Sequence, residues 1–317
     1  MVLSTDQASL WWRALKPGSW SKLLVPLALG QAIGIAHAGR IDLFALLLGI
    51  GFTLADLAFV VLLNDYGDRD VDALKRRMYP EGCSPKTIPD GLLPARAVRR
   101  AGLLAGALAL AIALAGELLF DRPGLTLGGL LCLLLFQVYS FPPLRLNYRG
   151  GGEWLEMLGV GLVLPWWNAF LQGGEPLPGG LLLLLGFCLL AASSALGSGL
   201  SDECSDARGG KRTVVVRLGN GRTKLLVEVL VLAAAVVWGL SSALLPDQLS
   251  PWMLLPVCAW LGLRLVALRR LAPAAVTDAF RELRSWKAEL NGTIMTSGTW
   301  ISAALVLRTL LLPGIGS

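Results

Sequence analysis

The sequence predicts an all-α, polytopic membrane protein with about nine transmembrane helices, because apolar runs of helical length recur along the whole chain. Of the 317 residues, 55% are hydrophobic, which is more than soluble domains usually carry. Runs such as 43–63 and 179–200 approach the roughly 20 residues that a helix needs to cross a bilayer. A soluble protein with so large a core would need amphipathic helices or strands between these runs, which the sequence does not show.

Turn-forming residues separate the apolar runs and set their limits. Glycine and proline clusters break the chain between them, as at Pro142-Pro143 and at 150–152. The polar connections are short and no internal repeat is evident, so we expect a single transmembrane domain over residues 1–317. The expected spans are 21–38, 43–64, 97–119, 124–140, 154–172, 179–201, 223–245, 251–271 and 292–312.

Basic residues predict the orientation of these spans. Of the 28 lysines and arginines, all but Arg40, Arg122 and Arg308 fall on the N-terminal segment, on connections that follow even-numbered spans, or on helix ends beside them. The positive-inside rule places that side in the cytosol. We expect a multi-pass protein of the cell inner (plasma) membrane, with a cytosolic N-terminus and a non-cytosolic C-terminus. Topology accounts for the basic charge, so we expect no nucleic acid partner.

An acidic motif follows directly on the second span. Asp65, Asp68 and Asp72 are spaced i, i+3 and i+7, which places them on one face of a helix. Three carboxylates on one face repel one another unless a cation binds between them, and oxygen ligands suit Mg²⁺, which also binds substrate phosphates. A solvated helix end would not explain why the acids adjoin an apolar span, where ionisable groups are costly and usually functional.

A second acidic pair follows the sixth span. Asp202 and Asp206 are spaced i and i+4, and the basic residue Lys211 comes shortly after them. By the predicted topology, both motifs lie at the cytosolic ends of even-numbered helices and form a site for a Mg²⁺-bridged diphosphate. Lys211 would contact its phosphate oxygens. We expect all five aspartates to bind Mg²⁺, four of them in the catalytic role: Asp65, Asp68, Asp202 and Asp206.

Other residues within the spans are interpreted as structural. Asp56 lies nine residues before Asp65, roughly opposite to it on an ideal helix, so we interpret it as an interhelical hydrogen-bond partner rather than a catalytic base. Trp166 and Trp167 could line a cavity, but the aromatic belt at the membrane interface is the more frequent position of tryptophan.

The two acidic motifs resemble the signatures of the UbiA-type intramembrane prenyltransferases, in the patterns Asn64-Asp65-x-x-Asp68-x-x-x-Asp72 and Asp202-x-x-x-Asp206. The resemblance runs from Lys16-Pro17 to the ninth span. It implies a UbiA-type helical bundle in the lipid bilayer that uses Mg²⁺ and transfers a prenyl group from a prenyl diphosphate to an aromatic acceptor. The residues that the resemblance assigns to the diphosphate, beside Lys211, are Asn64, Lys86, Tyr139 and Arg145.

The acceptor is suggested by a closer resemblance. Gly152-Glu153 and the stretch 206–219 are most similar to 1,4-dihydroxy-2-naphthoate polyprenyltransferases, which act in menaquinone (quinone) biosynthesis. The chain departs from that pattern at Ser198-Gly199, where an Asn pair is usual, at Lys86, where Arg is usual, and in the insertion 80–85. Open alternatives are a 4-hydroxybenzoate-like or chlorophyllide acceptor, a UbiA-type terpene cyclase, and a membrane transporter, which would hold its charges near the bilayer midplane.

Overall fold

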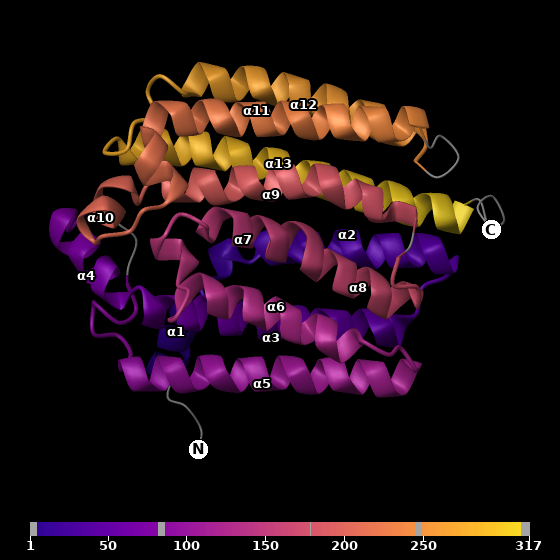
Figure 1. Cartoon of the computed structure of the whole chain (residues 1–317), viewed down its shortest axis with the longest axis horizontal. Helices are drawn as coiled ribbons and strands as arrows, with labels where there is room; N and C mark the ends of the chain where they lie inside the picture. The colour runs from indigo at the N-terminus through magenta and orange to yellow at the C-terminus, as the bar shows by residue number, and fades with distance from the viewer. Residues whose placement is uncertain (1–4, 82–85, 178, 245–248, 312–317) are drawn as a thin grey trace.

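The computed structural model describes residues 5–81, 86–177, 179–244 and 249–311, and the regular elements in those ranges are all helical. The long helices run side by side along one direction (Figure 1). Within the described residues, eight helical segments are long and apolar enough to cross a membrane, and the apolar helix α6 (Leu125–Ser140) is shorter. The eight are α2 (Ser21–Ala38), α3 (Leu43–Gly67), α5 (Ala95–Phe120), α7 to α8 (Gly152–Gly173), η4 with α9 (Gly179–Gly199), α11 (Val214–Leu244), α12 (Pro251–Leu271) and α13 (Phe280–Leu311).

The predicted fold class is confirmed, and most of the expected spans match these helices closely. Two helices begin much earlier than expected. The helix α11 includes a first turn before Gly219, whose φ of 75° interrupts the helical backbone. The helix α13 starts at Phe280, because Leu283 and Trp286 bury one face of a polar segment that hydropathy alone does not reveal. In the fifth span, a π-helical turn over Gly159–Val163 lies between α7 (Gly152–Leu158) and α8 (Leu164–Gly173).

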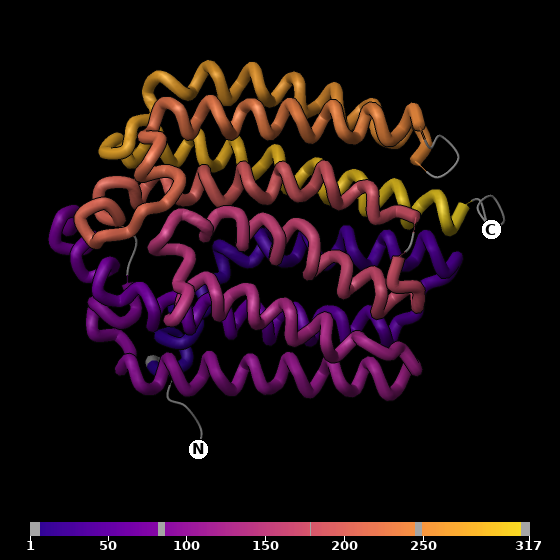
Figure 2. Tube along the Cα trace, in the orientation of Figure 1, coloured from indigo at the N-terminus to yellow at the C-terminus, as the bar shows by residue number. Residues whose placement is uncertain are grey.

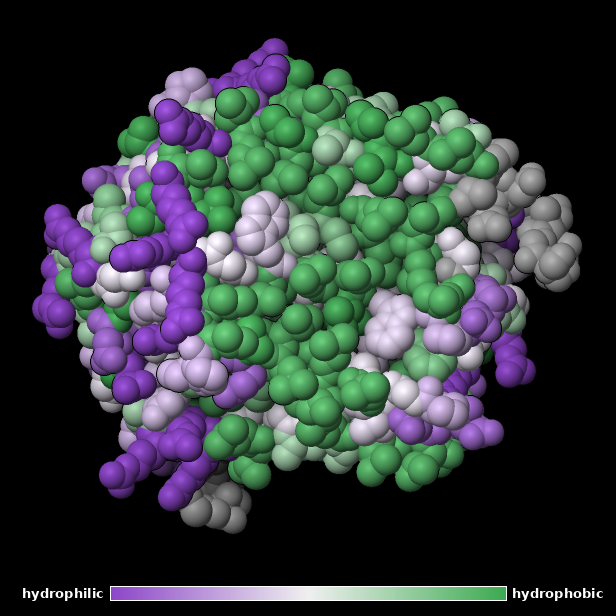
Figure 3. Space-filling view, viewed as in Figure 1, coloured by the Kyte–Doolittle hydropathy of each residue, from purple (hydrophilic) through white to green (hydrophobic). Residues whose placement is uncertain are grey.

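A broad apolar belt surrounds the middle of the bundle. Figure 3 shows hydrophobic side chains across the centre of the visible face, with hydrophilic side chains gathered mainly at the two ends. Leucines on the outside of α5 are largely exposed, such as Leu104 at 71% and Leu118 at 73%. Apolar side chains exposed in this way along a helix are stable only against lipid, since water would disfavour them. The chain is therefore a multi-pass integral membrane protein.

Tight pairing of distant helices closes the bundle. The last helix α13 packs against α2 near the start of the chain, and α2 also packs along α8 (Figure 2). Gly30 and Gly34 of α2 allow this approach, because a Cβ at either position would meet the backbone of α8 at 2.2 Å or 2.6 Å. Small residues commonly serve helix contacts in membranes in this way.

Short helices collect at one end of the bundle. They include α1 (Thr5–Ala14), α4 (Arg69–Met78) and α10 (Glu203–Arg208), and α4 contacts α10 (Figure 1). The acidic motifs predicted from the sequence lie where α3 and α9 give way to these short helices, so they share one end of the molecule.

Candidate active site

A cavity of about 270 Å³ lies among α2, α3, α6 and α7 near the end that carries α4 and α10. Most of its wall is apolar, with residues such as Leu23, Val60 and Phe136. Polar side chains line it as well. They are Lys16, Ser19, Lys22, Asp56, Asn64, Tyr139 and Glu156.

Lysines from distant segments pair with the first acidic motif. Asp65 forms an ion pair with Lys16, which also lines the cavity. Asp72 lies on α4 and pairs with Lys86 of the following loop at 2.6 Å. These contacts place the first motif at the mouth of the cavity, with ammonium groups beside its carboxylates.

Lys211 joins the two motifs. Its ammonium lies 2.8 Å from a carboxylate oxygen of Asp68 and 3.5 Å from one of Asp206. The remaining aspartate, Asp202, pairs with Lys75 of α4. Each of the five predicted aspartates thus contacts a lysine, and Lys211 directly joins the first motif to the second.

The spacing of the first motif predicts a single straight helix, but the structure shows a break at Asp68. Asp68 has φ −98° and ψ 5°, so α3 ends at Gly67 and α4 begins at Arg69. The bend turns Asp68 toward a short turn, η2 (Leu146–Tyr148). From this turn the Tyr148 hydroxyl donates to one oxygen of Asp68 at 3.2 Å, and the Asn147 amide donates to the other at 3.5 Å.

Burial and neighbouring charges shift the pKa values of the two aspartates of the second motif in opposite directions. Burial raises the pKa of Asp206 to about 7, Lys211 opposes that shift, and the nearby carboxylates of Asp202 and Asp68 add to it. Desolvation would also raise the pKa of Asp202, but the ammonium groups of Lys75, Lys86 and Lys287 together outweigh it and hold that pKa below its usual value. Asp202 therefore has its own counter-ion, whereas Asp206 shares Lys211 with Asp68.

The donor set fits a divalent cation that also binds phosphate. Every candidate ligand is a carboxylate, and Asp65 Oδ2 is buried without a hydrogen-bond partner among the residues that the structure describes. Within the described ranges, no three His, Cys, Asp or Glu side chains converge closely enough to enclose an ion by themselves. Mg²⁺ suits this arrangement, because it usually binds one or two protein carboxylates and completes its shell with water and substrate phosphates.

Comparison of the sequence with known protein families gives the family of this chain. Residues 23–287 match the UbiA prenyltransferase family, which is most of the chain and includes both acidic motifs. The chain belongs to the UbiA prenyltransferase family. It is therefore a UbiA-type prenyltransferase, and the predicted resemblance is confirmed at the level of the family. None of the curated proteins matches the sequence significantly.

Solved structures of UbiA proteins share the fold. A UbiA homolog from Archaeoglobus fulgidus aligns with a TM-score of 0.69 at 19% identity, over 95% of this chain and 98% of that one. The same homolog bound to GPP and Mg²⁺ aligns with a TM-score of 0.67 at 18% identity, over 94% and 99%. A structure described for digeranylgeranylglyceryl phosphate synthase aligns with a TM-score of 0.60 at 14% identity, over 93% and 99%.

The residues that the UbiA resemblance assigns to the diphosphate fall at three places. Asn64 and Tyr139 line the cavity, and Lys86 and Lys211 lie among the aspartates. Arg145 lies one side chain farther away: its guanidinium is 3.5 Å from the ring centre of Tyr148 and donates to the Gly67 carbonyl at 3.3 Å. For all five residues, the role toward diphosphate remains a prediction.

Sequence reasoning missed part of the UbiA site. Lys16, Lys75, Asn147 and Tyr148 each contact an acidic residue of the two motifs. Lys75 could have been found, since it follows Asp72 by three residues and so lies on the same face of a helix. The others come from segments far from the motifs in sequence, where spacing gives no signal.

Two structural interpretations are corrected. Asp56 forms no interhelical hydrogen bond in the described part of the chain: it lines the cavity, it is 4% exposed, and its Oδ1 has no hydrogen-bond partner there. Trp167 is not interfacial but fully buried, stacked on Phe52 at 3.8 Å with its indole donating to the Leu125 carbonyl. Neither Trp166 nor Trp167 lines the cavity.

The insertion 80–85 falls mostly outside the described residues, as does Cys83.

Proposed function

We propose that this UbiA-family enzyme transfers a prenyl group from a prenyl diphosphate to 1,4-dihydroxy-2-naphthoate, with Mg²⁺ as its cofactor. The observation that carries the proposal is the contact of Lys211 with both Asp68 and Asp206, which joins two acidic motifs beside an apolar cavity. An acidic and basic cluster suits a metal-bound diphosphate, and the apolar cavity suits an isoprenoid chain.

The polar cluster would bind the diphosphate and stabilise its departure. The ammonium groups of Lys16, Lys86 and Lys211 would neutralise the negative charge that grows on the diphosphate as the allylic C–O bond breaks. When bound to the aspartates, Mg²⁺ supplies Lewis-acid stabilisation of the same leaving group. The five aspartates would hold Mg²⁺ together with water and diphosphate oxygens, with one or two carboxylates on each ion, as the A. fulgidus homolog bound to GPP and Mg²⁺ supports.

The cavity would hold the prenyl chain and keep water from the allylic cation. Phe136 and Tyr139 lie on its wall beside Asn64, where their rings can stabilise a cation. An electron pair of the acceptor ring then forms the new C–C bond to the allylic carbon. The attacked ring carbon loses a proton, or its carboxyl group as carbon dioxide, while the bonding electrons of the C–O bond leave with the diphosphate.

Asp56 supports an acceptor that carries hydroxyl groups. It faces the cavity about 12 Å along α3 from Asn64, at eight residues and 1.5 Å each. A prenyl chain has no hydrogen-bond donor for the unpaired Oδ1 of Asp56, whereas a phenolic hydroxyl can donate to it. The hydroxyls of a dihydroxynaphthoate would also make the ring carbon nucleophilic without a protein base.

The naphthoate is favoured by the resemblance of Gly152-Glu153 and of the stretch 206–219 to naphthoate enzymes, and these two stretches contact each other. The carboxylate of Glu153 accepts a hydrogen bond of 2.8 Å from the backbone N–H of Val214. This contact fixes the start of α11 just after the loop that carries Lys211. Glu153 would therefore position the diphosphate-binding loop.

Product analysis tests the proposal. Membranes containing the protein would be incubated with a prenyl diphosphate together with one acceptor at a time: 1,4-dihydroxy-2-naphthoate, 4-hydroxybenzoate or a chlorophyllide. A further incubation would contain no acceptor. We expect a prenylated naphthoate product by mass spectrometry, its loss with a chelator and its return with Mg²⁺. Another prenylated acceptor would overturn the naphthoate assignment alone. A cyclised hydrocarbon formed without acceptor would indicate a terpene cyclase.

A further inference from the structure

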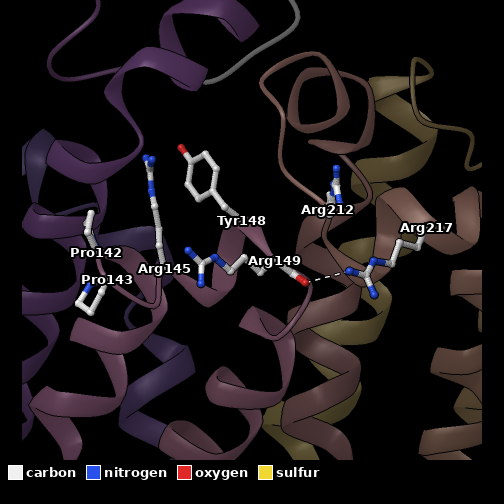
Figure 4. Close-up of a pocket in the computed structure, with 7 residues that line it drawn as sticks. All are labelled: Pro142, Pro143, Arg145, Tyr148, Arg149, Arg212 and Arg217. Carbon is white, nitrogen blue, oxygen red and sulfur yellow. Dashed lines mark hydrogen bonds between the residues drawn. The ribbon is translucent and has the colours of Figure 1, made fainter.

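A second pocket, rich in arginine, opens beside the polar cluster. It has a volume of about 420 Å³ and is lined by Pro142, Pro143, Arg145, Tyr148, Arg149, Arg212 and Arg217. Figure 4 shows the four arginine side chains around this space, carried by the turn after α6, the loop before α11 and the first turn of α11. None of these described lining residues is acidic. Four guanidinium groups beside one space repel one another unless an anion binds among them.

The local backbone builds this pocket. Arg217 donates to the Arg149 carbonyl at 2.9 Å, as the dashed line in Figure 4 shows. Gly150 has φ 90°, and a Cβ there would lie 2.8 Å from the Arg217 guanidinium carbon, so only glycine permits this approach. Arg145 is held against the Tyr148 ring. Two of the four guanidinium groups are thus fixed, which reduces the entropy lost when they bind a ligand.

The surroundings of the pocket place it at the level of lipid headgroups. Leu144 precedes Arg145 and is 46% exposed, and Trp154 of α7 is 41% exposed. Exposed tryptophan is typical of the membrane–water interface. Figure 3 shows hydrophilic side chains at this end of the molecule directly bordering the apolar belt.

We propose that this arginine pocket binds the phosphate of an anionic phospholipid headgroup. Guanidinium groups match phosphate oxygens in bidentate geometry, and basic pockets beside membrane-spanning helices suit anionic headgroups. Free pyrophosphate has the same phosphate chemistry, but it would not need the exposed apolar rim. The site is separate from the acidic cluster, because Tyr148 stands between Arg145 and Asp68.

Native mass spectrometry of the purified full chain in detergent tests this assignment. The protein would be titrated with phosphatidylglycerol and with phosphatidylcholine, and we expect preferential binding of the anionic lipid. The triple variant Arg149→Gln, Arg212→Gln and Arg217→Gln should bind phosphatidylglycerol on the order of 100-fold more weakly. Each single variant should weaken it roughly fivefold, which keeps the test valid if the triple variant does not fold.

A matched control has three exposed arginines replaced at the same end of the molecule, Arg222→Gln, Arg281→Gln and Arg284→Gln. This control variant should bind the anionic lipid as the wild type does. The pocket variant should bind inorganic pyrophosphate, measured by calorimetry, as the wild type does. Equal losses in both triple variants would mean that only overall charge matters, and would overturn the pocket. Lost pyrophosphate binding with unchanged lipid binding would assign the pocket to a free anion instead.

Discussion

At the scale of single residues, the five aspartates of the two motifs share four lysines, and this pairing explains how so many charges lie side by side. Removing one partner from a buried ion pair leaves the other charge uncompensated, which is more costly than the pair itself. The lysines come from four different segments, so the cluster also ties together the loops that surround the cavity mouth.

Removing a carboxylate should stop the reaction. We expect Asp65→Asn and Asp202→Asn each to abolish detectable prenyl transfer, because each loses a candidate Mg²⁺ ligand while keeping nearly the same shape. The assay is product formation by purified, folded protein. Asp70→Asn is the matched control, since Asp70 lies in the same motif but is 85% exposed, and it should keep its rate. A wild-type rate for either motif variant would show that this residue is no ligand.

Lys211 should act mainly on the diphosphate substrate. Loss of a charge-assisted contact to the leaving group should cost on the order of 1.5–3 kcal/mol in Lys211→Ala, or about 10- to 150-fold in kcat/KM for prenyl diphosphate. The KM for the aromatic acceptor should change much less. Steady-state kinetics with each substrate varied in turn would decide, and a raised acceptor KM with unchanged prenyl diphosphate kinetics would refute the role.

Asp56 should act mainly on the aromatic acceptor. We expect Asp56→Leu to raise the acceptor KM roughly two- to tenfold, because a hydrogen bond to a neutral group contributes about 0.5–1.5 kcal/mol. The KM for prenyl diphosphate should stay near its wild-type value. Asp56→Asn keeps an acceptor oxygen and should have a smaller effect. If the leucine variant binds the acceptor normally, the hydroxyl of the acceptor does not reach this residue.

At the scale of helices, the sequence predicts what depends on hydropathy and misses what depends on packing. The span 251–271 matches α12 because its apolar stretch ends in Arg269 and Arg270. Asp56 lies roughly opposite Asp65 on an ideal helix, but the cavity lies against the face of α3 that carries Asp56 and Asn64, and Asp65 does not line it. The positive-inside rule predicts both acidic motifs at one end, whereas their lysine partners come from a short helix and from loops, which this rule does not pair with particular aspartates.

The packing of α2 on α8 should be sensitive to a single methyl group. Gly30→Ala would place a Cβ 2.2 Å from the Pro165 carbonyl oxygen, so the helices must separate, and overpacking of this kind typically destabilises by about 1–3 kcal/mol. Thermal unfolding of the detergent-purified protein should show a lower midpoint. Gly262→Ala on α12 has open space around the added methyl and is the matched control. Equal midpoints for the two variants would contradict the close contact.

At the scale of the whole molecule, α6 decides the orientation of everything that follows it. With 16 residues it is shorter than the roughly 20 that usually span a bilayer, yet it packs between α5 and α7 within the bundle. If α6 crosses, the described chain has nine crossings and α13 ends opposite to α4 and α10, as Figure 1 draws it. If it does not, Asp202 and Asp206 would lie on the opposite side of the membrane from Asp65 and Asp68, which contradicts the contacts of Lys211 with both motifs.

The orientation itself can be measured with reporters fused at three positions. A reporter within 76–96, beside the first motif, should be cytosolic, because the basic residues gather at that end. A reporter between α5 and α6, at 121–124, should be non-cytosolic, and so should one fused after Ser317. A cytosolic signal after Ser317, with the other two as expected, would show that one later segment fails to cross. Reversal of all three signals would move the acidic cluster to the opposite side of the membrane, away from a cytosolic supply of prenyl diphosphate.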